Sequence, residues 1–111
     1  MADEQDRPAL EARWLHLTRV ELPELAPTRD WPVSLDHCFQ RILLDAACGG
    51  CWYEHITGRP AYRHADDGTL TAAVAMAEAV AAGKADLHAF NAQSLAWRGK
   101  GRTAAKSRRR I

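Results

Sequence analysis

Apolar residues recur at helical spacing in three segments of this 111-residue chain, and glycine follows each segment. The segments cover residues 34–46, 69–82 and 86–97, and they are followed by Gly49–Gly50, Gly83 and Gly99. Apolar side chains three and four positions apart lie on one face of an α-helix, and glycine commonly ends a helix. The pattern therefore predicts an all-α fold, a small bundle of three or four helices.

Side-chain oxygens before these segments are expected to cap the helices, because they can accept the free backbone N–H groups at a helix start. The expected caps are Ser34, Asp67 or Thr69, and Asp86. Only about three residues join the last two helices, so we expect these helices to lie side by side and antiparallel. Large side chains should fill the centre of the bundle, namely Phe39, Trp52, Phe90 and Trp97.

Prolines interrupt residues 13–33 at Pro23, Pro27 and Pro32. Proline lacks a backbone N–H and restricts the residue before it, so no long helix is expected there. Residues 14–22 fit either a short strand or a helical turn that continues from Ala9, and the later part should form an extended arm across the helices. A short helix is expected at residues 51–57, followed by a loop at 59–68.

The net charge of +1 hides an uneven distribution along the chain. Seven basic residues and no acidic residue lie in residues 98–111, so residues 1–97 carry a net charge of −6. The low apolar content at the two ends predicts a disordered basic tail at residues 99–111 and a flexible acidic N-terminus at residues 1–12. A single helical domain is then expected to span residues 13–98.

The basic tail could contact nucleic-acid phosphates without sequence specificity, since it is cationic and has no aromatic residue to stack on a base. The residues expected to make such contacts are Lys100, Arg102, Lys106, Arg108, Arg109 and Arg110. Two other interpretations stay open. The tail could increase solubility, or it could bind the acidic part of the chain or an acidic protein partner.

Cysteine usage and hydropathy bear on the compartment. Three cysteines cannot all pair within one chain, and a chain of this size can fold without disulfides. No apolar run approaches the roughly 18 residues of a membrane-spanning helix, and the acidic first residues are unlike a secretory signal. We therefore expect a cytoplasmic protein without membrane contact, and no cofactor apart from the zinc ion considered next.

The paired-cysteine motif Cys48-Gly-Gly-Cys51 is the main candidate for metal chemistry. Two thiolates across a glycine turn can bind Zn²⁺, and His55, one helical turn after Cys51, could be a third ligand. His64 or Cys38 could complete the site. The favoured alternative is that the cysteines are small core side chains. A redox role is disfavoured because the strand–helix alternation of thioredoxin-like folds is missing.

A polar stripe on the first long helix is the second candidate site. His37, Arg41 and Asp45 are spaced four residues apart, so we expect them on one face, opposite the apolar face. Histidine beside a carboxylate can transfer protons, and arginine can hold an anion. Nearby residues that could wall a pocket and contact a ligand are Trp52, Tyr53, His55 and Tyr62. The favoured alternative is a solvated face with an Arg41–Asp45 pair.

The chain lacks the phosphate-loop, dinucleotide-binding, zinc-protease and serine-hydrolase motifs. The expected function is a small cytoplasmic interaction or regulatory module that binds a protein or a small ligand through the surface of Trp52, Tyr53, His55 and Tyr62. The first alternative, a small enzyme or ligand-binding protein, uses His37, Arg41 and Asp45, but catalysis is not the favoured interpretation. The second is a nucleic-acid-associated protein with contacts from the basic tail.

Overall fold

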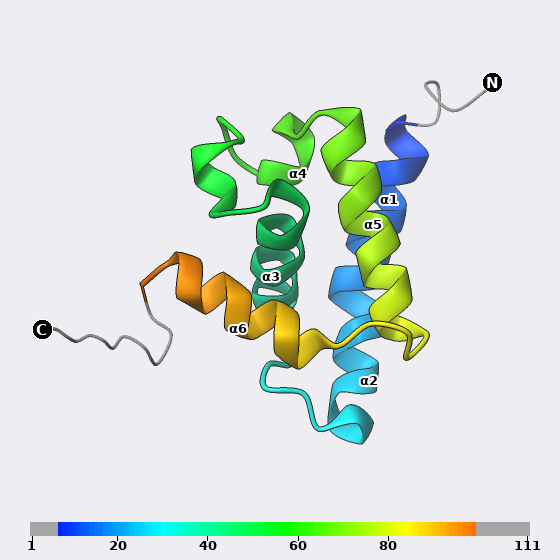
Figure 1. Ribbon diagram of the computed structural model, residues 1–111. Coiled ribbons are helices and arrows are strands. Elements are labelled where there is room, and N and C mark those ends of the chain that lie inside the picture. The colour runs from blue at the N-terminus through cyan, green and yellow to red at the C-terminus, as the bar shows by residue number, and fades with distance from the viewer. Residues whose placement is uncertain (1–6, 100–111) are drawn as a thin grey trace, which may run out of the picture.

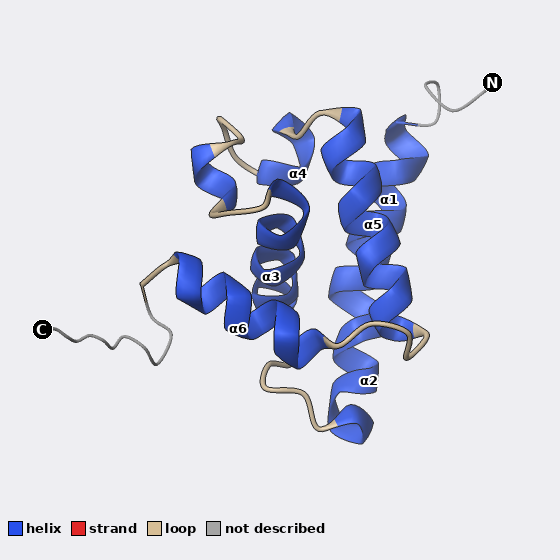
Figure 2. Cartoon of the chain, viewed as in Figure 1, coloured by secondary structure: helices blue, strands red, loops and turns tan. Residues whose placement is uncertain are grey.

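Helices form every regular element in residues 7–99, the part of the chain that the computed structural model describes, and this part contains no strand (Figure 1, Figure 2). The longer helices are α1 (Arg7–His16), α2 (Leu22–Arg29), α3 (Asp36–Cys48), α5 (Asp67–Ala81) and α6 (Leu87–Trp97). The shorter elements are the π-helix η2 (Leu17–Glu21), the 3₁₀-helix η3 (Trp52–Glu54) and α4 (Ala61–His64). The expected all-α fold is confirmed.

The first three elements follow one another without a break, so that residues 7–29 form one helical rod (Figure 1). The prediction of an extended arm is wrong, and residues 7–12, expected to be flexible, are the first turns of α1. Pro23 falls in the first turn of α2, where a proline breaks few intrahelical bonds. The π turn of η2 directly precedes Pro23, and Pro27 lies inside α2, so the rod continues through both prolines.

The core lies between the N-terminal rod, α3 and α5, which pack against one another. The rod contributes Trp14, Leu17 and Leu22, all fully buried. Fully buried residues of the other two helices are Phe39, Ile42 and Leu43 in α3 and Leu70, Ala73 and Ala77 in α5. The small alanine side chains of α5 allow close helix approach, which a larger side chain at the same positions would prevent.

Helix α6 crosses α3 instead of lying antiparallel against α5, which corrects the expected pairing (Figure 1). Its buried residues are Leu87 near the start and the polar Ser94 near the end. Phe90 is partly buried against the core, whereas Trp97 is 36% exposed and does not fill the centre. That place is taken by Trp14, which is 0% exposed.

Aspartates cap the starts of α5 and α6. Asp86 accepts a backbone N–H in the first turn of α6 at 2.9 Å, as expected. At the start of α5 the cap is Asp66 rather than Asp67 or Thr69, and its carboxylate lies 2.7 Å from the backbone nitrogen of Thr69. Helix α3 has no side-chain cap, so the expected Ser34 cap is not formed.

The connection between α3 and α5 differs from the expected short helix and loop. Only the three residues of η3 are helical where a helix over residues 51–57 was expected, and α4 forms inside the expected loop. Both short elements lie beside α3 at the same end of the molecule (Figure 1). This connection borders the face of α3 that carries His37 and Arg41.

Candidate functional site

A cleft of about 240 Å³ opens between α3 and the connection that follows it. Helix α3 contributes four residues at the i, i+3, i+4, i+7 spacing of one helix face, namely His37, Gln40, Arg41 and Leu44. The connection contributes Trp52, Arg59, Pro60 and Ala61. The cleft therefore brings together His37 and Arg41 of the predicted stripe and Trp52 of the predicted aromatic set.

The lining of the cleft carries two arginines and a histidine but no acidic residue. The guanidinium carbon of Arg59 lies 5.2 Å from the centroid of the Trp52 ring, which is a cation–π distance. The side chain of His37 is 74% exposed, and its Nδ1 atom lies 3.6 Å from the Asp36 carboxylate. The cleft thus combines positive charge with an aromatic face and is accessible from solvent at His37.

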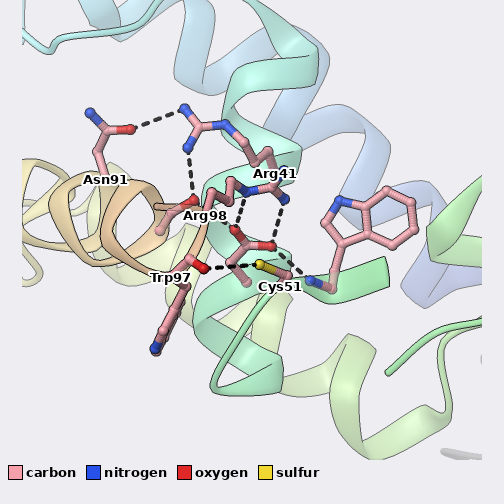
Figure 3. A network of polar contacts seen from close by, with 8 residues as sticks. Arg41, Cys51, Asn91, Trp97 and Arg98 are labelled. Atoms are coloured by element: carbon pink, nitrogen blue, oxygen red, sulfur yellow. Dashed lines mark hydrogen bonds and ion pairs between the residues drawn. The ribbon is translucent and has the colours of Figure 1, made fainter. Parts of the chain in front are cut away.

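Helix α6 holds Arg41 in place (Figure 3). Its Nη1 atom donates to Ser94 Oγ at 2.7 Å, and its Nη2 atom donates to Asn91 Oδ1 at 3.0 Å. Both acceptors are neutral, and none of the ion pairs within residues 7–99 involves Arg41. A guanidinium has five N–H donors, and these two hydrogen bonds, both directed toward α6, use two of them (Figure 3).

The N-terminal rod holds Gln40, a cleft residue that the sequence analysis did not single out. Its Nε2 atom donates to Thr18 Oγ1 at 3.0 Å. The Thr18 hydroxyl in turn donates to the backbone carbonyl of Trp14 at 2.9 Å. Thr18 belongs to the π-helix η2 and is fully buried. Two polar residues of the cleft are therefore positioned from outside α3, by two different elements.

Asp45 is fully buried, which corrects its predicted role as an exposed acid–base group. Its carboxylate accepts the backbone N–H of Trp52 at 2.9 Å and the hydroxyl of Ser94 at 2.6 Å. Arg98 donates to it through Nε at 2.9 Å and Nη2 at 3.0 Å (Figure 3). These hydrogen bonds to Asp45 raise the pKa of Arg98. The carboxylate joins α3, η3 and the end of α6, so the expected set of His37, Arg41 and Asp45 is not one site.

The four residues expected to contact a ligand do not form one surface. Trp52 lines the cleft, whereas Tyr53 is 51% exposed and lies under the guanidinium of Arg98, 5.1 Å from ring centroid to Cζ. The imidazole of His55 lies so close to Gly50 that a Cβ there would stand 3.3 Å from its Nε2 atom. Tyr62 packs against the core near α1. Of the four, only Trp52 belongs to the cleft.

The cysteines occupy separate environments. Cys51 is buried, and its thiol donates to the backbone carbonyl of Trp97 at 3.6 Å. Burial raises the pKa of the half-buried Cys48 thiol, and the carboxylates of Asp45 and Asp66 raise it further. Within residues 7–99, no three His, Cys, Asp or Glu side chains are grouped so that they could hold a metal ion, so Cys48, Cys51 and His55 are not brought together as zinc ligands.

The predicted nucleic-acid contacts, Lys100 to Arg110, lie outside the described residues, and the prediction stays untested. Over the described range 7–99, no helix is both long and apolar enough to cross a membrane. The chain matches no protein-family model, no curated protein and no solved structure. The assignment of a function therefore rests on the chemistry of the cleft.

Proposed function

We propose that this protein is a small helical binding module that holds an anionic group, carried by a partner or by a small molecule, in the cleft between α3 and η3. The observation that carries the proposal is the environment of Arg41. Two neutral side chains position its guanidinium, and the cleft that it lines contains no carboxylate. A fixed guanidinium with free donors suits carboxylates and phosphates, because its planar fork can donate two parallel hydrogen bonds.

The second arginine supports the proposal. Arg59 lies over the Trp52 ring and makes no ion pair with any residue in the described part of the chain. Arg59 and Arg41 both line the cleft, so their positive charges add there. This charge favours an anion, and the apolar surface of Trp52 and Leu44 adds contact area for the rest of the ligand.

Binding is favoured over catalysis because the cleft lining within residues 7–99 has no serine, threonine, cysteine, lysine or acidic side chain that could act as a nucleophile beside His37, although the Asp36 carboxylate lies 3.6 Å from His37 Nδ1. His37 is the only histidine in this lining, and the buried Asp45 cannot assist it, because its oxygens already accept four hydrogen bonds. The proposed ligand site differs from the surface expected from the sequence. It includes Trp52 of that surface, but Arg41 and Arg59 take part in place of Tyr53, His55 and Tyr62.

Titration with a pentaglutamate peptide tests the proposal, with backbone amide signals of the isotope-labelled full-length protein as the readout. We expect saturable shifts around the cleft. Arg59→Gln should weaken binding about tenfold, the effect of losing one charge-assisted hydrogen bond. Arg63→Gln is the matched control, because it removes the same charge only four residues along the chain. The side chain of Arg63 lies over Tyr62 and does not line the cleft.

Two outcomes would contradict the proposal. One is the absence of saturable shifts at the cleft. The other is equal weakening by Arg59→Gln and Arg63→Gln, which would show that the peptide responds to net charge and not to this site. In that case the binding should also fall steeply with added salt, because attraction between exposed charges is screened.

A further inference from the structure

The shape and chemistry of the same cleft restrict the kind of anion that it can hold, and this inference rests on the proposed function. The lining contains two kinds of side chain. Four are polar, namely His37, Gln40, Arg41 and Arg59, and four are apolar, namely Leu44, Trp52, Pro60 and Ala61. A ligand that contacts both kinds needs an anionic head and an apolar body.

The size of the cleft limits that body. An apolar cavity of about 150 Å³ is large enough to hold a benzene ring, and drug-sized ligands occupy pockets of roughly 300–1,000 Å³. The volume of about 240 Å³ lies between these values. It accommodates one ring with a small substituent, whereas most of a nucleotide would extend out of the cleft into solvent.

The aromatic residue in the cleft favours a planar body. The Trp52 ring already has a planar cation over one face, the Arg59 guanidinium at 5.2 Å. It also packs edge-on against Tyr53, with the ring centroids 5.8 Å apart. A second flat group can add to this arrangement through offset or edge-to-face contact, which a puckered ring of equal size makes less well.

The limited volume favours a carboxylate as the head. A carboxylate and a phosphate can both accept two parallel hydrogen bonds from an arginine fork, but the planar carboxylate is smaller and leaves more of the 240 Å³ for the ring. Arg41 is already ordered by Ser94 and Asn91, so that binding loses little side-chain freedom there. We infer that the cleft between α3 and η3 binds a small planar aromatic carboxylate, with the carboxylate at Arg41 and Arg59 and the ring beside Trp52.

Sodium benzoate is the probe that tests this inference on the full-length protein. The chain has four tryptophans, and their indole N–H signals report each ring separately. We expect a saturable shift confined to the Trp52 signal, with a dissociation constant on the order of 1 mM for a ligand this small. Three matched compounds separate the contributions: benzyl alcohol lacks the charge, cyclohexanecarboxylate lacks the planar ring, and phenyl phosphate replaces the carboxylate.

Each comparison has an expected and an opposing result. Benzoate should bind about tenfold more tightly than any of the three compounds. Equal binding of benzyl alcohol, cyclohexanecarboxylate or phenyl phosphate would overturn the corresponding part of the inference. Arg59→Gln should weaken benzoate binding about tenfold and Arg63→Gln less than twofold. Arg59 makes no ion pair within residues 7–99, so Arg59→Gln should keep the fold, and far-ultraviolet circular dichroism checks this.

The pentaglutamate titration distinguishes failure of this inference from failure of the proposed function. If the peptide binds in an Arg59-dependent manner and benzoate does not, the cleft is an anion site for a partner's acidic side chains, and the aromatic carboxylate is wrong. If neither probe shifts the Trp52 signal, both the inference and the proposed function are wrong.

Discussion

Replacing Asp45 by alanine tests whether one buried carboxylate joins α3, η3 and the end of α6. The change removes the acceptor of four hydrogen bonds, which come from Trp52, Ser94 and Arg98. At a net value of about 1 kcal/mol each, they amount to about 4 kcal/mol. The side chain of Arg98 is 17% exposed, so water replaces the lost carboxylate only in part. Breaking a buried ion pair by removing one partner costs about 3–5 kcal/mol, which agrees with this sum.

We therefore expect Asp45→Ala to lower the free energy of unfolding by about 3–5 kcal/mol, a large share of the roughly 5–15 kcal/mol that stabilises a small domain. Urea denaturation followed by far-ultraviolet circular dichroism measures it. Asp36→Ala is the matched control on the same helix, because that carboxylate is 48% exposed and accepts only the neighbouring backbone N–H. It should cost less than about 1 kcal/mol.

A double-mutant cycle with Arg98→Ala makes the test specific for the ion pair. Residues in direct contact are coupled by about 0.5–3 kcal/mol, so the double variant should be more stable than the two single effects predict. Strict additivity would refute the ion-pair reasoning. A cost below about 1 kcal/mol for Asp45→Ala would refute the wider reasoning that the buried carboxylate holds these elements together.

Three further predictions concern other parts of the chain. Gly58→Ala should destabilise the fold by about 1 kcal/mol more than Gly83→Ala in urea. The φ of 118° at Gly58 is less accessible to alanine than the 78° at Gly83, and a Cβ at Gly58 would stand 2.7 Å from the His64 ring. Adding His64→Ala should remove the part of the difference that comes from the ring, and an unchanged difference would contradict the clash. The Asp66 carboxylate accepts a backbone N–H from Thr69, which lowers the pKa of Asp66, so its stabilising effect is present above the unfolded pKa of about 4 and is lost as the pH falls through the lower folded value. The loss of unfolding free energy caused by Asp66→Ala should therefore shrink in acid, and a loss that stays constant with pH would contradict this. Burial raises the pKa of Cys48 and so lowers the fraction of reactive thiolate. Iodoacetamide should therefore modify Cys48 more slowly at about pH 8 than it modifies a free thiol. Peptide mass spectrometry measures the two rates, and equal rates would contradict the burial of Cys48.

The sequence predicted the helices whose ends are marked by local chemistry. Gly49 and Gly83 adopt left-handed φ values of 73° and 78° at the ends of α3 and α5, and Asp86 caps α6. These signals act within a few residues, so they are readable without tertiary structure. The helical alternative for residues 14–22 is confirmed, whereas the extended arm expected after them is wrong, because α2 forms with Pro23 in its first turn and Pro27 inside it.

The candidate site was predictable only in part, for a geometric reason. Each α-helical residue turns about 100°, so positions four apart drift by about 40° per step. His37 and Arg41 therefore share the cleft face, while Asp45, a further step along, has turned into the interior. Arg59 reaches the cleft through the fold of the connection after α3, and no spacing in the sequence indicates that approach.

The π turn of η2 also sets the rotational phase between the two ends of the rod. One residue corresponds to about 100° of helix rotation, so deleting a single residue within 17–21 would restore a regular spiral and swing the indole of Trp14 away from its buried place. The amide of Gln40 would lose its anchor in the same movement, because Thr18 would turn with it. Chains that share this fold should therefore keep the length of that stretch even where they vary its residues.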